Sequence, residues 1–407
     1  MPWDSVTGKP LYNALVWSDL RTSHLCHELQ QRPASAAFPV AGADRYRART
    51  GLSISTYFSA LKLQWLLRHA PAVAAAAAKG TLRVGTVDSW LLYNLTGGAQ
   101  HGGIHATDVS NASRTLLLSL ASLDWDSDIC AELGVSTTWL PKVLCNAEKD
   151  GFGAVARGLP LAGARVTGLI GDQQGALLGQ MCLAPGDAKA TYGTGAFLLM
   201  NTGAVPVPST RGLLTTVAFK LAPAAQCQYA LEGSVAVAGA ALTWLQQSLE
   251  LVASAKEIDA LAEGVSDNGG VYFVPAFSGL LSPHWRDDAR GVVVGLTRFA
   301  KKAHLCRAAL EAAAFQTKDV LSVMEAESKL PVSGLRVDGG MSRSALLCQF
   351  QADLLGTPVQ YAKYVQTNQS GSNFFTLNVS YCRCCYFVSK TSLGYYALNC
   401  MYMFCSL

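Results

Sequence analysis

The sequence lacks long hydrophobic runs and clusters of basic residues, and each absence excludes a class of protein. Its longest alanine-rich stretch, residues 72–78, is far too short to span a bilayer, so we expect no membrane span. The net charge is only +4 over 407 residues, and no compact run of lysine and arginine occurs, so we expect no nucleic-acid partner. The N-terminus has no basic segment followed by an apolar run, which is the pattern of a secretory signal. These absences predict a soluble, cytoplasmic protein.

Metal-binding patterns are also missing, although cysteine is not. Seven of the 12 cysteines lie scattered over the first 350 residues without paired spacing, which predicts a reduced protein with buried thiols. The other five crowd into the last 26 residues, where Cys382, Cys384 and Cys385 lack a standard zinc spacing and a second half-site. The histidines show no spacing tied to carboxylates, so the metal-ligating residues stay unknown at this stage.

Alternating strand and helix patterns make up most of what is present. Half of the residues are hydrophobic and 15% are charged, which supplies sizeable cores for two or three domains. The patterns predict a strand at 164–170 with a helix at 174–180, a hairpin at 188–201, and a strand and helix at 335–340 and 345–355. This order of elements predicts a mixed α/β fold.

Other segments carry weaker local signals. The apolar run 11–17 predicts a buried strand, and residues 59–69 predict an amphipathic helix whose Lys62 can point outward. Residues 232–234, Glu-Gly-Ser, are expected to introduce an apolar helix over 238–251.

The most informative segments are 171–174, Gly-Asp-Gln-Gln, and 191–195, Thr-Tyr-Gly-Thr-Gly, about twenty residues further on. Asp172 can take a proton from a hydroxyl while the amide of Gln173 orients the acceptor. The glycines that flank Thr194 allow backbone N–H groups to approach phosphate oxygens. Either half alone is more often a polar helix start or a hairpin turn. Together they indicate phosphoryl transfer to an alcohol.

Three further features are ambiguous when each is taken alone. Residues 338–340, Asp-Gly-Gly, end a strand and open a helix, which fits a nucleotide site but also an ordinary glycine turn. Gly239 in an apolar helix indicates close helix packing more often than a ligand contact. Trp17 and Tyr57 can line a polar pocket, but aromatic residues at such positions usually belong to a core.

Several of these segments resemble one family. Over roughly residues 5–360 the chain resembles the glycerol kinases of the FGGY carbohydrate kinase family. The segments that carry this resemblance are 7–17, 57–69, 85–91, 107–115 and 274–298.

This resemblance implies an actin-like ATPase fold, in which two ribonuclease-H-like domains close over a cleft. Residues 1–180 would form the N-terminal kinase domain and residues 187–360 the C-terminal one, while 361–407 stay unassigned. The implied reaction is ATP-dependent phosphorylation of glycerol to sn-glycerol 3-phosphate, with Mg²⁺ as the metal ion. The partners are then glycerol and ATP, and a homo-oligomer is compatible with the resemblance.

The resemblance also assigns roles to single residues. Asp172 would be the general base on one glycerol hydroxyl, and Gln173 would hold another. Trp17, Tyr57 and Phe197 would shape the acceptor pocket. On the nucleotide side, Thr194 would contact the γ-phosphate region. The backbone at Gly239 and Gly340 would come close to the nucleotide, and the side chains of Thr243 and Ser344 would flank it.

The sequence departs from the family pattern in five features. Nothing matches the first phosphate loop or the Arg-Glu pair that binds glycerol, so we expect the N-terminal domain to be incomplete at its start. Thr243 stands where the family has Gln, and Ser344 where it has Asn. After residue 359 the pattern dissolves into a tail that reads like translated non-coding sequence or an alternative exon. The alternatives are a kinase of another small polyol or sugar, and an inactive fragment or pseudoenzyme.

Overall fold

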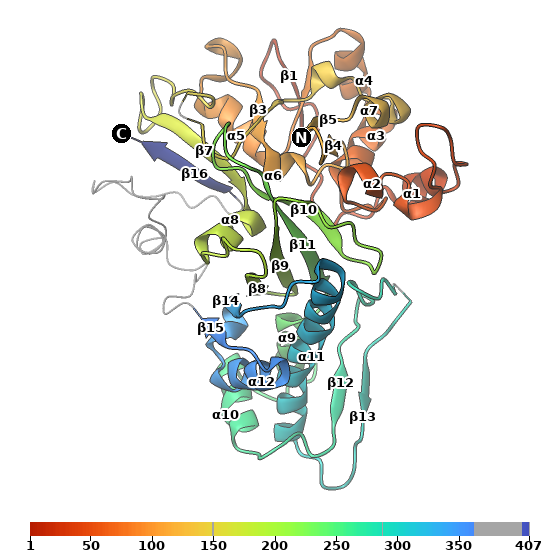
Figure 1. The fold of residues 1–407 in the computed structure, drawn as a ribbon, viewed down its shortest axis with the longest axis vertical. Coiled ribbons are helices and arrows are strands. Elements are labelled where there is room, and N and C mark those ends of the chain that lie inside the picture. Colours follow the sequence, from red (N-terminus) through yellow and green to blue (C-terminus); the bar gives the residue numbers. More distant parts are fainter. Residues whose placement is uncertain (149, 287, 362–400, 407) are drawn as a thin grey trace.

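A computed structural model describes residues 1–148, 150–286, 288–361 and, as backbone only, 401–406. Figure 1 shows an elongated molecule with a central sheet, the N-terminal segments on one side of it and the helices α9 to α12 on the other.

The central sheet has six strands in the order β10-β11-β9-β8-β14-β15. Neighbours from β10 to β8 are antiparallel, whereas β14 runs parallel to both β8 and β15. The strands β8, β9, β10 and β11 are buried along most of their length, because α11 packs on β9 and β11 and α8 packs on β8, β9 and β10. Their bounds are β8 Ala188–Tyr192, β9 Ala196–Gly203, β10 Leu214–Phe219, β11 Gln228–Val235, β14 Leu335–Gly339 and β15 Val359–Tyr361.

The C-terminal region contains four helices and a small hairpin, which gather around α11, and α11 packs against the sheet. The 27-residue helix α11 is alanine-rich where it is buried, which lets it lie close to the sheet and to α10 and α12. The elements are α9 Gly239–Gln247, α10 Ala255–Glu263, β12 Tyr272–Val274, β13 Val292–Val294, α11 Lys302–Ser328, the short helix η4 Gly340–Arg343 and α12 Ala345–Leu355.

The N-terminal region is built from short helices and two-stranded sheets around its own apolar core. β1 pairs with β2, β3 with β6, and β4 with β5. The strands are β1 Pro2–Asp4, β2 Leu82–Val84, β3 Ala106–Asp108, β4 Leu118–Ser119, β5 Asp124–Trp125 and β6 Lys142–Leu144. The helices are α1 Ser23–Gln30, α2 Arg47–Thr50, α3 Ser59–His69, α4 Pro71–Ala78, α5 Val87–Leu95, α6 Val109–Ala112 and α7 Ser127–Leu133.

One strand and one helix link this region to the central sheet. β7, Arg165–Gly171, ends where α8, Asp172–Gly179, begins. β7 also pairs antiparallel with β16, Met401–Ser406, so that Met401 lies opposite Gly171 (Figure 1). The chain after residue 359 therefore contains strands, although its sequence shows no period. The rest of the tail, 362–400 and 407, lies outside the described residues.

The structure confirms the strands and helices that were predicted from strong local patterns and corrects three others. Residues 11–17 form no strand and are partly to fully exposed, so the predicted buried strand is wrong. Lys62 does not point outward, because its side chain is only 6% exposed and its ammonium donates to backbone carbonyls. Residues 232–234 belong to the strand β11, although the apolar helix expected over 238–251 does form after it, as α9 over Gly239–Gln247. A strand that is buried on both faces shows no apolar–polar alternation, which explains the last error.

The predictions about membrane spans and about the cysteines can both be compared with the described residues. Within them, no helix is long and apolar enough to cross a membrane. All seven cysteines up to Cys348 are buried and unpaired, as predicted.

Candidate active site

Asp172 lies at the first residue of α8, where the chain leaves the buried strand β7. Its carboxylate is exposed and accepts a hydrogen bond from the backbone N–H of Gln173 at 2.7 Å. The position is favourable for a carboxylate, because the N-terminus of a helix carries free N–H groups and partial positive charge. The strand end thus presents a hydrogen-bond acceptor to solvent.

A buried network on α6 holds the strand end that precedes Asp172. The backbone N–H of Gly171 donates to Ser110 Oγ at 2.9 Å, and Ser110 Oγ in turn donates to Asp108. Asn146 Nδ2 donates to Asp108 Oδ1 at 2.8 Å and to the carbonyl oxygen of Leu169 at 3.1 Å. Burial, together with the charge of the nearby Asp88, raises the pKa of Asp108 to about 7. Side chains from the β3–α6 junction and from the loop after β6 therefore fix the backbone that carries Asp172.

The three predicted pocket aromatics come together from distant parts of the chain. The Trp17 ring lies 5.5 Å from the Tyr57 ring and 6.2 Å from the Phe197 ring, between centroids. The Trp17 side chain is 57% exposed, so it does not belong to a core. These rings form an aromatic cluster that is open to solvent, as a pocket wall requires.

Behind Tyr57 lies a charged pair that the sequence did not identify. Arg114 Nη2 donates to Glu232 Oε1 at 2.8 Å, and the guanidinium lies 5.5 Å from the Tyr57 ring centroid. Glu232 is only 1% exposed. Burial alone would lower the pKa of Arg114, but Glu232, Tyr57 and Asp172 raise it. A single Arg and a single Glu far apart in sequence carry no motif, so only the fold reveals the pair.

Lys189 on β8 is a second buried charge that the sequence did not identify. Its side chain is fully buried, and its ammonium donates to Gln173 Oε1, to Thr191 Oγ1 at 3.0 Å and to the carbonyl oxygen of Phe197 at 3.4 Å. Burial lowers the pKa of Lys189, against the opposite effect of the carboxylates of Asp338, Asp172 and Glu232. Lys189 thereby connects the start of α8 with the β8–β9 hairpin.

The hairpin turn of Thr194 is joined to the start of α9. The N–H groups of Ala238 and Ala240 donate to the carbonyl oxygen of Thr194 at 2.9 and 3.0 Å. A Cβ atom at Gly239 would lie 2.5 Å from the carbonyl oxygen of Gly193, so this contact requires glycine. Gly193 and Thr194 themselves are exposed, which leaves the turn accessible to a ligand.

The remaining predicted nucleotide residues lie within α9, directly after β14 and at the start of α12. A Cβ atom at Gly340 would meet nothing within 4 Å, so the backbone there faces open space. Thr243 is exposed on α9, and its hydroxyl donates to the carbonyl oxygen of Gly239 at 3.2 Å. Ser344 is buried and caps α12, since its Oγ accepts from the N–H of Leu347 at 3.2 Å. Ser344 therefore has a structural role in addition to any contact with a nucleotide.

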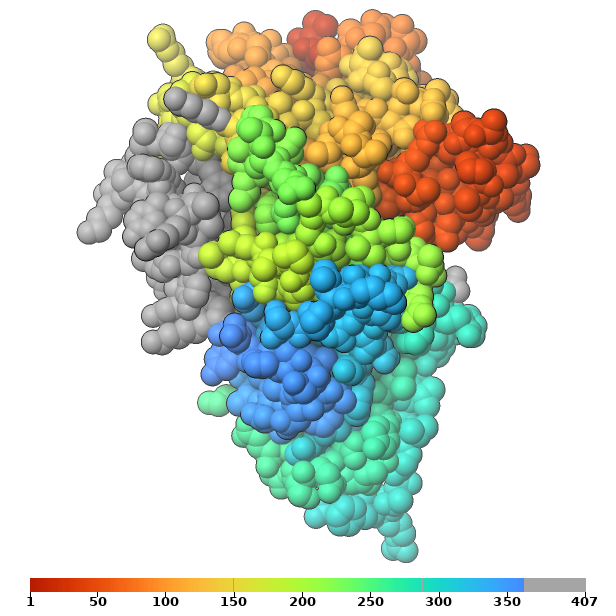
Figure 2. Space-filling view, in the orientation of Figure 1, coloured from red at the N-terminus to blue at the C-terminus, as the bar shows by residue number. Residues whose placement is uncertain are grey.

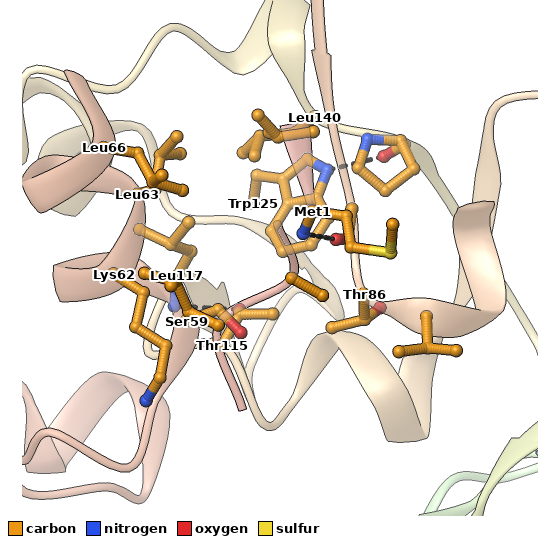
Figure 3. Close-up of a pocket in the computed structure, with 16 residues that line it drawn as sticks. Met1, Ser59, Lys62, Leu63, Leu66, Thr86, Thr115, Leu117, Trp125 and Leu140 are labelled. Carbon is orange, nitrogen blue, oxygen red and sulfur yellow. Dashed lines mark hydrogen bonds between the residues drawn. The ribbon is translucent and has the colours of Figure 1, made fainter. Parts of the chain in front are cut away.

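A cavity of about 160 Å³ lies elsewhere, in the N-terminal region (Figure 3). It is lined mainly by apolar side chains, among them Leu63, Leu66 and Leu140, and by none of the predicted site residues. At its edge the amino group of Met1 donates to the carbonyl oxygen of Gly85 at 2.7 Å, and burial lowers the pKa of that amino group to about 6. The lining offers few polar partners, so this cavity is not the candidate active site.

The candidate site therefore consists of two adjoining parts. The acceptor part combines Asp172, Gln173 and the aromatic cluster, and the phosphate part is the Thr194 turn with the start of α9. Figure 2 shows the yellow-green surface of the α8 segment directly beside the blue C-terminal helices on one face of the molecule. Among the described residues, no group of three or more His, Cys, Asp or Glu side chains could hold a metal ion.

Comparison with known proteins identifies relatives along most of the chain. Residues 1–179 match the N-terminal domain of the FGGY family of carbohydrate kinases, and residues 188–372 match its C-terminal domain. The chain is 51% identical over 375 residues to a glycerol kinase of Saccharopolyspora erythraea, covering 91% of this chain and 72% of that protein. It is 52% identical over 374 residues to a glycerol kinase of Methylorubrum populi, with the same coverage.

A solved structure extends the likeness to three dimensions. The crystal structure of Plasmodium falciparum glycerol kinase with ADP superposes with a TM-score of 0.82 at 38% sequence identity. The match covers 89% of this chain and 69% of that one. The expected two-domain, actin-like fold is thereby confirmed.

Proposed function

Because the chain belongs to the FGGY family of carbohydrate kinases, we propose that it transfers the terminal phosphoryl group of ATP to glycerol and forms sn-glycerol 3-phosphate. The observation that carries this proposal is the arrangement around Lys189. One ammonium links Gln173 of the acceptor part to the β8–β9 hairpin of the phosphate part. A hydroxyl beside Asp172 and a phosphate at the hairpin would then be neighbours.

In the proposed reaction, a glycerol hydroxyl oxygen attacks the γ-phosphorus as the bond to the β-phosphate oxygen breaks. Asp172 accepts the hydroxyl proton late in the transfer, and ADP leaves with the bond electrons. Gln173 holds another hydroxyl, and the rings of Trp17, Tyr57 and Phe197 cover the carbon chain. Positioning the two reactants in this way supplies much of the acceleration in phosphoryl transfer.

The nucleotide would lie across the hairpin turn and the ends of α9 and β14. Thr194 would contact the γ-phosphate, because its turn is exposed and flanked by glycines. Gly239 and Gly340 would let the backbone come close to the nucleotide. Thr243 and Ser344 would flank it, with smaller side chains than the family pattern has.

We also propose Mg²⁺ as the metal ion of the reaction. A Mg²⁺ ion at a kinase site is held largely by phosphate oxygens and water, with one or two carboxylates. The exposed carboxylate of Asp172 is an oxygen ligand of this kind. The bound ion would offset the negative charge of the phosphates.

The domain limits and assembly state remain proposals. We assign residues 1–180 and 187–360 to the two kinase domains, and leave 361–407 outside them.

Self-association is supported by one exposed apolar face of the β12–β13 hairpin, where Tyr272 lies opposite Val294 and Val274 opposite Val292. Sedimentation of the wild type beside a Val292→Glu variant tests this, since the charge should dissociate an oligomer that uses this face. A cytoplasmic location is compatible with the unpaired thiols.

The function is tested by measuring ADP release with a coupled assay under reducing conditions. Glycerol, dihydroxyacetone, xylulose and glycerate are compared as acceptors, and we expect glycerol to give the highest kcat/KM. A higher value for xylulose or glycerate would identify a kinase of another polyol or sugar. ADP release that no acceptor increases would contradict the kinase proposal.

A further inference from the structure

Lys189 is a fully buried lysine that no described carboxylate pairs with directly. Its three N–H donors go to three neutral oxygens, on Gln173, Thr191 and Phe197. Burying an ammonium is costly unless its hydrogen bonds are satisfied, so all three contacts are needed to keep this side chain in place. The Lys189 ammonium therefore holds fixed positions on α8, β8 and β9 at once.

The contact with Gln173 determines which way its side-chain amide points. An ammonium only donates hydrogen bonds, so the oxygen Oε1 of the amide must face Lys189 and the NH₂ group must face away. Among the described residues, that NH₂ group donates no hydrogen bond, whereas the backbone N–H and Oε1 of Gln173 are both engaged. It is consequently available to a ligand beside Asp172.

We propose that Lys189 is a positioning residue that sets the polarity of the acceptor site, an inference that rests on the proposed function. With Oε1 engaged, Gln173 offers only N–H donors, and a substrate hydroxyl binds there through its oxygen. Asp172 offers only acceptors, so it takes the proton of the hydroxyl that reacts. The site then selects acceptors that carry, besides the hydroxyl that is phosphorylated, a hydroxyl on the particular carbon that faces Gln173.

A purely structural role for Lys189 predicts a different result. In that case, removing its side chain would lower the stability of the protein and reduce kcat/KM equally for all acceptors. If Lys189 acts through Gln173, its removal specifically reduces the preference for glycerol over the analogues 1,2-propanediol and 1,3-propanediol, each of which lacks one hydroxyl. A site that hydrogen-bonds a hydroxyl discriminates against the analogue without it, because its own donor is left unpaired.

The kinetic test is a double-mutant cycle of Lys189→Met and Gln173→Leu in the full chain. The preference is the ratio of kcat/KM for glycerol to kcat/KM for the diol that the wild type uses least well. We expect each single change to reduce this ratio by about tenfold. The double variant should lose no more than Gln173→Leu alone, because both changes remove the same interaction. Lys189→Gln keeps N–H donors and should retain part of the preference. Additive losses, or an equal loss for all acceptors, would overturn the proposal.

A second measurement does not depend on turnover. Selective ¹⁵N-glutamine labelling reports the side-chain NH₂ group of Gln173, which is assigned as the signal missing in Gln173→Leu. We expect glycerol to shift this signal in the wild type, and Lys189→Met to shift it and to speed its hydrogen exchange. Lys62→Met removes another buried lysine that contacts only backbone carbonyls, and it should leave the signal in place.

The two measurements separate the two proposals. If the Gln173 NH₂ signal shifts neither with saturating glycerol nor in Lys189→Met, the proposed role of Lys189 is wrong, whatever the kinetics show. A chain that phosphorylates no acceptor contradicts the proposed function, and the response to Lys189→Met then still decides whether Lys189 holds Gln173.

Discussion

At the scale of single residues, the candidate site combines exposed reactive groups with buried groups that hold them. Asp172 and Thr194 are exposed, whereas Lys189 and Glu232 are at most 1% exposed. This division is physically reasonable, because a base must reach its substrate while the groups that orient it must not move. Substitutions at the exposed residues should therefore change kinetics with little change in stability.

Asp172→Asn is expected to lower kcat by about two to four orders of magnitude, the range for loss of a general base. The KM for glycerol should change much less, because the amide keeps the size of the side chain. Steady-state kinetics of the wild type and of Asp172→Asn at several pH values provide the measurement. A loss below tenfold, with the chemical step shown to be rate-limiting, would remove Asp172 from this role.

Trp17→Ala is expected to raise the KM for glycerol more than the KM for ATP. The ring contacts Tyr57 and Phe197, so its removal opens one wall of the acceptor pocket. Because the Trp17 side chain is 57% exposed, the melting temperature should change little. Equal changes in both KM values, or a large loss of stability, would show that the residue supports the fold instead.

Gly340→Ala tests the nucleotide side of the site. The added methyl group meets no atom of the chain within 4 Å, so we expect an unchanged melting temperature. If the nucleotide lies against this backbone, the KM for ATP should rise several-fold while the KM for glycerol stays constant. An unchanged KM for ATP would place the nucleotide elsewhere.

At the scale of elements, the site depends on how β7 and α6 are fastened together. Gly171 donates its backbone N–H to a serine on the short helix α6, a contact between residues 61 positions apart. The serine is fixed by Asp108, which also caps α6 through the N–H groups of Ser110 and Asn111. The position of the strand end that precedes Asp172 is thus set by a buried polar network, and such networks are sensitive to the loss of one member.

Ser110→Ala should lower kcat by roughly ten- to a hundredfold, because small displacements of a reacting group are costly. It should also speed hydrogen exchange at the Gly171 amide, measured by mass spectrometry of peptides over 169–173. Ser113→Ala is the matched control, since Ser113 is equally buried and bonds to Ser110 and Thr216 but not to β7. Equal kinetic effects of both variants would contradict a positioning role for Ser110.

At the scale of the whole molecule, stability should depend on pH through buried titratable groups. His105 packs its ring 5.0 Å from Trp3 and contacts the carbonyl oxygen of Val84 at 2.8 Å. Burial lowers the pKa of His105 from 6.5 to about 4, although the contact with Val84 raises it. The folded state therefore favours the neutral ring, and the unfolded chain binds a proton at higher pH.

The contribution of His105 to stability is complete above pH 6.5 and is lost as the pH falls toward 4. The loss at the acidic end should reach roughly 3 kcal/mol in the free energy of unfolding. Urea unfolding of the wild type and of His105→Gln, compared over this range, isolates the effect from other groups. Parallel pH profiles for the two proteins would contradict it.

The elements that the sequence predicted are those with local causes. The hairpin of β8 and β9 follows from its glycine turn, and α12 follows from its apolar period and the cap of Ser344. Asp172 was singled out because an acid, an amide and two glycines are adjacent in the chain. The roles of Asp172, Thr194 and the other predicted site residues remain predictions until the experiments above are done.

Features that depend on distant contacts could not be predicted in this way. β10 and β11 are buried on both faces and carry no alternation, so they were missed. Lys62 reads as an outward residue of an amphipathic helix, yet nearby carbonyls on the loop before that helix bind its ammonium.

By itself, then, the sequence determined the α/β class, the family and the adjacent acid, amide and phosphate turn, because each rests on neighbouring residues. Only the tertiary structure decided that Trp17 meets Phe197, that Arg114 pairs with Glu232 and that Lys189 joins Gln173 to the hairpin. Hydrogen bonds and buried charges act over a few ångströms of space, and chain folding sets which residues come within that range.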